Sequence, residues 1–324
     1  MKCITFLAVL CSAAAALAGE VAFPALVKPR EIRTVVADGK HNAFTAVVRW
    51  RGAYWLSFRK GPSHSYGEAD LIVLRSPDGD SWSEHKRVNW LTDDRDPSLL
   101  ATPTRLLLYD VAMEGSKLTS FVTFTDDGKT WSTPQPVCQQ QYIFWKPIEH
   151  GGRFYATAHL KSHDGKERPV HLITSTDGIE WERISKIRGG NSESETTLHF
   201  ASDEKMVAFL RQKHGSPQAS ILESAAPFEH WDERPCDVHL AGHSVYTFDG
   251  VTYLFSRTHH EKGTGTMVYV YEDGRLHPYC RIPSGGDCSY PSAVRIGEEM
   301  LVSYYSSHEG ATNIYTARVP LRLK

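Results

Sequence analysis

Three segments of the sequence share one seven-residue pattern, Ser/Thr-x-Asp-Gly-x-x-Trp, at nearly even intervals. They occupy residues 76–82, 125–131 and 175–181, and each ends on a tryptophan. A fourth tryptophan, Trp231, follows after a similar interval without the Asp and Gly. A fixed period of about 50 residues is typical of repeat architectures, and the chain beyond residue 18 has room for about six such units.

Short apolar segments fill the space between these turns. Segments 53–59, 71–75, 105–109 and 119–124 are rich in Val, Ile, Leu, Tyr and Phe, which favours strands. No long helical period follows residue 19. Four short strands in each of six units predict an all-β fold, a six-bladed β-propeller of four-stranded antiparallel blades. The last strand, 313–319, is expected to pair with N-terminal strands and close the ring, which removes sheet edges.

The repeated pattern itself predicts a turn. An Asp side chain can bond the backbone two residues further on, Gly supplies a positive φ, and Ser or Thr caps the turn. The Trp ring can then pack beneath the hairpin. We interpret these segments as structural and not as ligand sites. Trp55, Trp90 and Trp145 could stack on sugars, but we expect them mainly between blades.

Charge and composition exclude several classes of function. The 36 Lys and Arg residues nearly balance 38 Asp and Glu residues, for a net charge of −2, so neither a basic nucleic-acid binder nor an acidic tail protein is expected. The 8 Trp and 14 Tyr residues favour a β-rich core or a sugar-binding surface. Nucleotide-binding glycine loops and metal-ligand spacings such as H-E-x-x-H are absent, so we predict no cofactor and no catalytic metal, with calcium in a turn left open.

The N-terminus reads as an export signal. Lys2 precedes an apolar stretch, 4–17, and Ala16-Leu17-Ala18 has the form of a cleavage site. We therefore expect a signal peptide over 1–18 and a single domain over 19–324, secreted or periplasmic. No later stretch is long and apolar enough to span a membrane. In an exported chain the remaining cysteines could pair in three ways or stay free, and they are Cys138, Cys236, Cys280 and Cys288.

The repeated turns resemble the Asp-boxes of the sialidase (neuraminidase) superfamily. The resemblance implies a six-bladed propeller that cleaves terminal sialic acids. It further implies three arginines on the substrate carboxylate, a tyrosine nucleophile paired with a glutamate, and an aspartate acid/base. A guanidinium group matches a carboxylate with two parallel bonds. A tyrosine nucleophile avoids bringing a second negative charge to the anomeric carbon of an acidic sugar.

Four residues match the family pattern in sequence. Segment 191–211 resembles the family's glutamate-to-arginine segment and assigns Glu195 as the base and Arg211 as one arginine. Segment 286–294 is similar to the segment of the tyrosine nucleophile, which makes that residue Tyr290, and the third arginine would be Arg257. Without the resemblance, Glu195 and Arg211 read equally well as a structural ion pair, and Tyr290 as a core or rim residue.

The first arginine and the acid/base depart from the family pattern. Stretch 41–48 has no arginine, and Arg59 or Arg95 could take its place. The acid/base is either Asp96 or a residue of the loop around His64, although Arg95 and Asp96 could instead pair with each other.

Asp287 is either a further carboxylate near the tyrosine or a turn residue. Because the first arginine and the acid/base depart from the family pattern, the sugar need not be sialic acid and is left as an acidic or a neutral one. The main hypothesis is a monomeric exo-glycosidase acting on a glycan. The alternatives are a non-catalytic propeller that binds a carbohydrate or a protein, and a glycosidase or lyase that uses a carboxylate pair.

Overall fold

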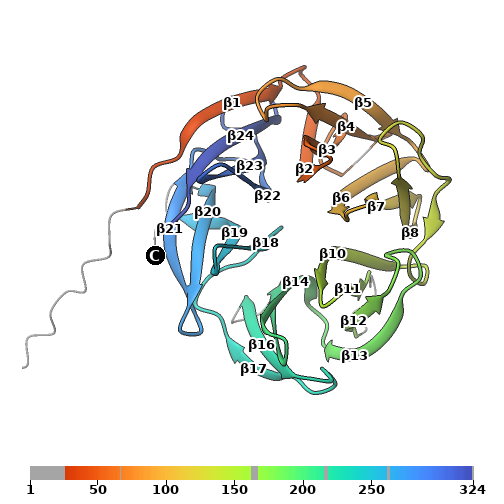
Figure 1. The fold of residues 1–324 in the computed structure, drawn as a ribbon, viewed down its shortest axis with the longest axis vertical. Coiled ribbons are helices and arrows are strands. Elements are labelled where there is room, and N and C mark those ends of the chain that lie inside the picture. Colours follow the sequence, from red (N-terminus) through yellow and green to blue (C-terminus); the bar gives the residue numbers. More distant parts are fainter. Residues whose placement is uncertain (1–25, 66, 162–166, 215–217, 261–262, 323–324) are drawn as a thin grey trace, which may run out of the picture.

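The computed structural model describes residues 26–65, 67–161, 167–214, 218–260 and 263–322. The predicted signal peptide, 1–18, lies outside these residues. The described chain forms strands β1 to β24 in six four-stranded sheets, arranged as blades around a central axis (Figure 1). The prediction of an all-β, six-bladed propeller is confirmed.

The first three blades follow the chain from the innermost strand outward. Their strands are β2 (His41–Trp50), β3 (Ala53–Gly61), β4 (Asp70–Ser76) and β5 (Ser83–Val88) in blade 1; β6 (Asp93–Ala101), β7 (Leu106–Glu114), β8 (Lys117–Thr125) and β9 (Gln135–Pro136) in blade 2; and β10 (Tyr142–His150), β11 (Arg153–Leu160), β12 (Val170–Ser175) and β13 (Glu182–Arg188) in blade 3.

The other three blades complete the ring. Their strands are β14 (Glu193–Ser202), β15 (Lys205–Gln212), β16 (Ala219–Ala225) and β17 (Asp232–Pro235) in blade 4; β18 (Ser244–Phe248), β19 (Val251–His260), β20 (Gly263–Glu272) and β21 (Arg275–Ile282) in blade 5; and β22 (Cys288–Ile296), β23 (Glu299–Ser306), β24 (Asn313–Pro320) and β1 (Arg30–Val36) in blade 6.

Blade 6 joins the two ends of the chain. Strand β1 lies antiparallel to β24, with Arg33 opposite Thr316, and forms the outer edge of the blade (Figure 1). The expected closure by the last strand is therefore confirmed. Because the outermost strand of this blade comes from the other end of the chain, opening the ring would break a whole ladder of backbone hydrogen bonds.

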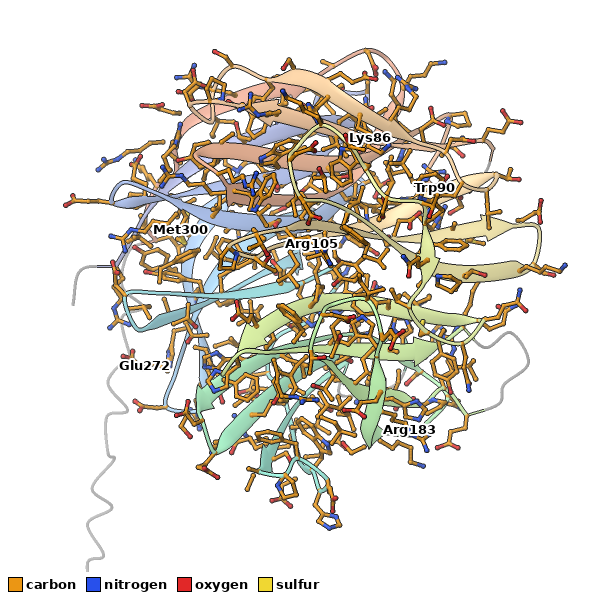
Figure 2. The ribbon with its side chains drawn as sticks, turned by 45° about the vertical axis from the view of Figure 1, so that its right-hand side comes forward. Lys86, Trp90, Arg105, Arg183, Glu272 and Met300 are labelled. Atoms are coloured by element: carbon orange, nitrogen blue, oxygen red, sulfur yellow. The ribbon has the colours of Figure 1, made fainter. Side chains whose placement is uncertain are left out.

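The hydrophobic core is divided among the gaps between blades. Six clusters of buried side chains each combine residues from two neighbouring blades. Met300, for example, is fully buried between blades 5 and 6, where side chains fill the space between the ribbons (Figure 2). Each blade thus buries one face of its sheet against each neighbour, which holds the inner strands at fixed angles around the axis.

The repeated turns connect the third and fourth strands of blades 1, 2 and 3. In the first, the backbone N–H groups of Asp80 and Ser81 donate to Asp78 Oδ1 at 2.9 and 2.8 Å, and Gly79 has a φ of 84°. The third turn also contacts the preceding blade, because Tyr109 donates its hydroxyl proton to the carbonyl of Gly178 at 2.7 Å. These bonds show a structural role for the turns, as the sequence predicts.

Two further sequence expectations concern cysteines and membranes. The four cysteines after the predicted signal peptide are free thiols, so none of the three possible pairings forms. In the part of the chain that the structure describes, no helix has the length and hydropathy of a membrane span.

Candidate functional site

A β-bulge recurs in the inner strands and points side chains at the axis. The register slips by one residue between Ala43 and Ala46 in β2, and at the corresponding place in β6, β10, β14 and β22. In each bulge two residues face one residue of the partner strand. The first of these two has a positive φ in four strands, at Phe44, Asp96, Lys146 and Tyr290. A bulge breaks the alternation of faces and re-aims one side chain, which is a common device beside functional sites.

These bulges surround a cavity of about 530 Å³ at one end of the axis. Most residues that the sequence singled out line this cavity, and they are His64, Arg95, Asp96, Glu195, Arg211, Arg257 and Tyr290. A second cavity of the same volume lies along the other ends of the inner strands, and its walls are mostly aliphatic. The charged cavity is therefore the candidate site.

Tyr290 and Glu195 meet in this cavity although they are far apart in the sequence. The Tyr290 hydroxyl donates to Glu195 Oε1 at 3.3 Å. Neighbouring residues of β2 hold Tyr290 in place. Thr45 Oγ1 donates to the Tyr290 carbonyl at 2.7 Å, and the ring centres of Phe44 and Tyr290 are 4.6 Å apart. A Cβ on Gly242 would lie only 2.6 Å from the Tyr290 ring, so only glycine leaves room for the tyrosine in this position.

The charges in the cavity set the protonation of the pair. Burial alone would raise the pKa of Glu195, but Arg211 and Lys213 outweigh it and hold that pKa well below its usual range. Arg211 Nη1 donates to both Glu195 carboxylate oxygens at 2.8 and 2.9 Å. Burial and the nearby Asp96 and Glu195 charges raise the pKa of Tyr290 well above its usual value. The resting pair is therefore a neutral phenol bonded to a carboxylate.

The pKa of Asp96 is shifted in the opposite direction to that of Glu195. Burial is the main cause that raises its pKa, with the Glu195 and Asp93 carboxylates adding to the effect, while Arg95 opposes it. Its Oδ1 atom is buried without a hydrogen-bond partner among the described residues. A raised pKa keeps this carboxyl group protonated to higher pH than an ordinary aspartate, which suits a proton donor. Two carboxyl groups with opposite shifts are a typical arrangement of an acid and a base.

Of the four arginines that line the cavity, Arg95, Arg211 and Arg257 come from three different blades. Arg211 holds Glu195, and Arg257 donates from Nε to the carbonyl of Cys288 at 2.6 Å and from Nη2 to the Tyr305 hydroxyl at 3.3 Å. Arg95 donates from Nη2 to Asp93 Oδ2 at 2.6 Å, and its guanidinium carbon lies 5.8 Å from the Phe44 ring centre. Each of these three arginines is thus held in place, which favours recognition of a fixed anionic group.

Arg59 is not brought to the cavity. Its side chain is fully buried, and it donates from Nε to Asp93 Oδ1 at 2.7 Å and from Nη1 to the carbonyl of Ser63 at 2.7 Å. The sequence left open whether Arg59 or Arg95 replaces the family's first arginine. Arg95 reaches the cavity and Arg59 does not. The reason is that β3 directs Arg59 into the space between blades, where it ties Asp93 of the next blade.

Asp287 also lies behind the cavity wall and not in it. Its Oδ2 atom is 2.8 Å from His41 Nε2 and 2.7 Å from His64 Nδ1, and its Oδ1 accepts from the Tyr305 hydroxyl at 3.1 Å. Asp287 therefore orients His64, which does line the cavity. The ligand atoms of His41, His64 and Asp287 lie within 4.8 Å of one another and could hold a divalent cation, but the hydrogen bonds alone account for their arrangement.

Sequence reasoning missed several lining residues, and these are Phe44, Trp145, His159, Lys161, Arg168 and Lys213. Trp145, expected mainly between blades, instead packs at 5.5 Å against Tyr290 and is only 2% exposed. One available signal is that a proline directly follows three of the bulge residues, in Asp96-Pro97, Lys146-Pro147 and Tyr290-Pro291. The first two lie one repeat apart and the third about three repeats further on.

Comparison with known proteins supports the fold. No model of a protein family matches the sequence, and no curated protein does. Solved structures do match. A Trypanosoma rangeli sialidase in complex with 2,3-difluorosialic acid is 12% identical with a TM-score of 0.67, covering 86% of this chain and 54% of its own. The phage phi92 endosialidase is 9% identical with a TM-score of 0.70, covering 92% and 70%.

A third match is an α-L-arabinofuranosidase variant from Fusarium graminearum in complex with an iminosugar inhibitor, 12% identical with a TM-score of 0.66, covering 86% of this chain and 92% of its own. The chain has the fold of a sialidase-like propeller. At these identities the likeness shows the fold alone, and this propeller spans just over half of the Trypanosoma rangeli sialidase chain.

The two arginines around Asp93 give a testable contrast within this sialidase-like propeller. We expect Arg59→Met to lower the free energy of unfolding by about 3 kcal/mol, because it removes one partner of a buried ion pair. Arg95→Met should cost less stability, since Asp93 keeps Arg59, but should weaken binding of an acidic ligand. Urea unfolding of both variants measures the first effect, and a larger loss in Arg95→Met than in Arg59→Met would contradict this assignment.

Proposed function

We propose that this protein is an exo-acting glycoside hydrolase that removes a terminal acidic sugar, with Tyr290 as nucleophile and Glu195 as its base. The observation that carries the proposal is the hydrogen bond from Tyr290 to Glu195 inside a cavity whose lining includes Arg95, Arg211 and Arg257. Nucleophilic catalysis needs a base within hydrogen-bond reach of the nucleophile, and this pair satisfies that requirement. We further propose that residues 1–18 direct export and that the chain acts as a monomer.

The proposed reaction has two steps. Tyr290 attacks the anomeric carbon while its proton passes to Glu195, and Asp96 gives its proton to the departing glycosidic oxygen. In the second step Asp96 takes a proton from water, the resulting hydroxide displaces Tyr290 from the anomeric carbon, and Glu195 returns the proton to the phenolate. Two displacements at one carbon retain the anomeric configuration.

The arginines link substrate binding to the chemistry. A sugar carboxylate bound by Arg211, Arg257 and Arg95 would share the Arg211 guanidinium with Glu195. The pKa of Glu195 is low mainly because Arg211 opposes the effect of its burial, so this competition would raise it and make Glu195 a better base. An acidic sugar would thus activate the base that serves it.

A hydrolysis screen tests the proposal. The purified protein is incubated with aryl glycosides of sialic acid, of related ulosonic acids and of uronic acids, and NMR follows the first anomer released. We expect turnover of an acidic glycoside with retention. A 2,3-difluoro analogue of the cleaved sugar, the type of ligand bound by the Trypanosoma rangeli sialidase, should leave an adduct on Tyr290 by mass spectrometry. Inversion, or an adduct on another residue, would refute the mechanism.

The pH dependence follows from Asp96. Because its pKa is raised, the acid form needed for protonation persists to higher pH than for an ordinary aspartate, and kcat should fall as pH rises through that pKa. Asp96→Asn should abolish this fall of kcat at alkaline pH, the alkaline limb of the pH profile. It should also reduce turnover of glycosides with poor leaving groups by about 10² to 10⁴-fold. It should spare 4-nitrophenyl glycosides, whose leaving group needs no proton.

The Asn variant also suits the backbone, since Asp96 has a φ of 51° and Asn tolerates this region well. If the alkaline limb persists in Asp96→Asn and disappears in His64→Asn, the acid is His64, oriented by Asp287.

A second candidate function rests on the two carboxyl groups themselves. Asp96 and Glu195 both line the cavity with opposite pKa shifts, which is the arrangement of an ordinary glycosidase acting on a neutral sugar. The arabinofuranosidase among the structural matches is consistent with such chemistry on this fold. In that case Tyr290→Phe would keep most of the activity, and the arginines would serve only to hold Glu195.

A further inference from the structure

The cavity carries more positive charge than the proposed chemistry uses. Arg95, Arg211 and Arg257 are held by Asp93, Glu195 and the group around Asp287, as described above. Three further cations, Lys161, Arg168 and Lys213, line the same cavity. Within the described residues neither lysine forms an ion pair with a carboxylate, and Lys161 Nζ instead lies 3.6 Å from Met113 Sδ.

Two described carboxylates of neighbouring segments, Glu167 and Glu193, are engaged with other cations. Glu167 accepts from Lys186 at 3.1 Å, and Glu193 is paired with Arg188. Burial lowers the pKa of Lys161, and the charges of Arg95 and Lys213 lower it further. Cations that repel one another in one cavity are stabilised when an external anion supplies the missing charge.

Both lysines extend the second strands of neighbouring blades. Lys213 follows β15, and its N–H donates to the Ser192 carbonyl at 2.8 Å; Lys161 follows β11, and its N–H donates to the Gln141 carbonyl at 2.8 Å. The ladders therefore continue through both residues, so each lysine shares a face with the lining residue two positions earlier, Arg211 or His159.

Two strand residues span about 7 Å, of the order of one sugar unit. Lys213 is exposed and Lys161 is half-buried, whereas Glu195 at the hub is only 5% exposed. The lysines therefore lie further toward the open end than the residues proposed to hold the terminal sugar. In an exo-acting enzyme the leaving part of the substrate must occupy this open end.

We propose that Lys161 and Lys213 form a second anion subsite, which takes a carboxylate or sulfate group on the leaving side of the substrate. The inference rests on the proposed glycosidase function and narrows its substrate class. The natural substrate would then be a glycan with acidic groups on both sides of the scissile bond, not an acidic sugar capping a neutral chain.

Matched aglycones test the subsite. The sugar cleaved in the screen is linked to phenols that carry a 4-sulfonate or its neutral counterpart, a 4-methylsulfone, and likewise a carboxylate or a carboxamide. The two pairs distinguish the two anion types at similar leaving-group strength. We expect about a tenfold higher kcat/KM for the anionic member of at least one pair, and the preference should shrink as NaCl screens the charges.

The Lys161→Gln/Lys213→Gln double variant should abolish this ratio, whereas Lys129→Gln, an exposed lysine in a turn of blade 2, should leave it unchanged. Equal kcat/KM for the charged and neutral members of both pairs, or a preference that survives in the double variant, would overturn the subsite.

A binding measurement separates failure of the subsite from failure of the proposed function. Isothermal titration of Tyr290→Phe with the same glycosides gives their Kd values without turnover. Hydrolysis of the neutral aglycones together with equal Kd values for charged and neutral members rejects the subsite alone. Absence of hydrolysis of every glycoside by the wild type rejects the proposed function, and a Kd ratio of about ten that is lost in the lysine double variant would still support the subsite.

Discussion

Replacing Tyr290 by Phe should lower kcat by about 10³ to 10⁶-fold, the range expected when the nucleophile of a covalent mechanism is removed. The change deletes one hydroxyl group and keeps the ring, so the contacts with Phe44 and Trp145 remain. Stability should change by only about 1 kcal/mol, the usual value of one hydrogen bond. Steady-state kinetics on an aryl glycoside, together with thermal unfolding, separate the two effects.

Tyr304→Phe is the matched control. Tyr304 is fully buried in β23, and its hydroxyl has no hydrogen-bond partner among the described residues. The same chemical change there should leave kcat unchanged. Wild-type turnover in Tyr290→Phe would remove the proposed nucleophile and favour the carboxylate-pair alternative.

Glu195→Gln is expected to lower kcat by about 10² to 10⁴-fold, because the amide cannot accept the Tyr290 proton as a base. The amide is nearly isosteric with the carboxylate, so the cavity should keep its shape. Arg211 would lose its charged partner and remain free to bind a substrate carboxylate. We therefore expect KM for an acidic glycoside to stay the same or fall while kcat drops, which a full Michaelis–Menten analysis can resolve.

Glu193→Gln provides the comparison for this variant. Glu193 lies two residues earlier in the same strand, is 1% exposed and pairs with Arg188 outside the cavity. Its neutralisation should reduce stability but not kcat. Equal losses of kcat in Glu193→Gln and Glu195→Gln would show that both act through the fold, and the base would have to be sought elsewhere.

The candidate site was only partly predictable from the sequence. Tyr290, Glu195, Arg211 and Arg257 were selected by resemblance, and the structure places all four on one cavity. Arg59 and Arg95 were left as alternatives, and the structure brings only Arg95 to the cavity, while Arg59 pairs with Asp93 in the space between blades. In the inner strands, a bulge residue changes which face the residues beyond it take, and the sequence does not mark these bulges unambiguously.

The sequence by itself determined the repeat, the number of blades and the strand content, because the turns and the apolar alternation are local and recur about every 50 residues. Ring closure also followed, since a propeller with free edges would be unstable. The tertiary structure decided which cations face the axis, that Phe44 stands on the wall where an arginine was sought, and that Lys161 and Lys213 share the cavity. These properties depend on bulges and on packing between blades, where residues hundreds of positions apart come into contact.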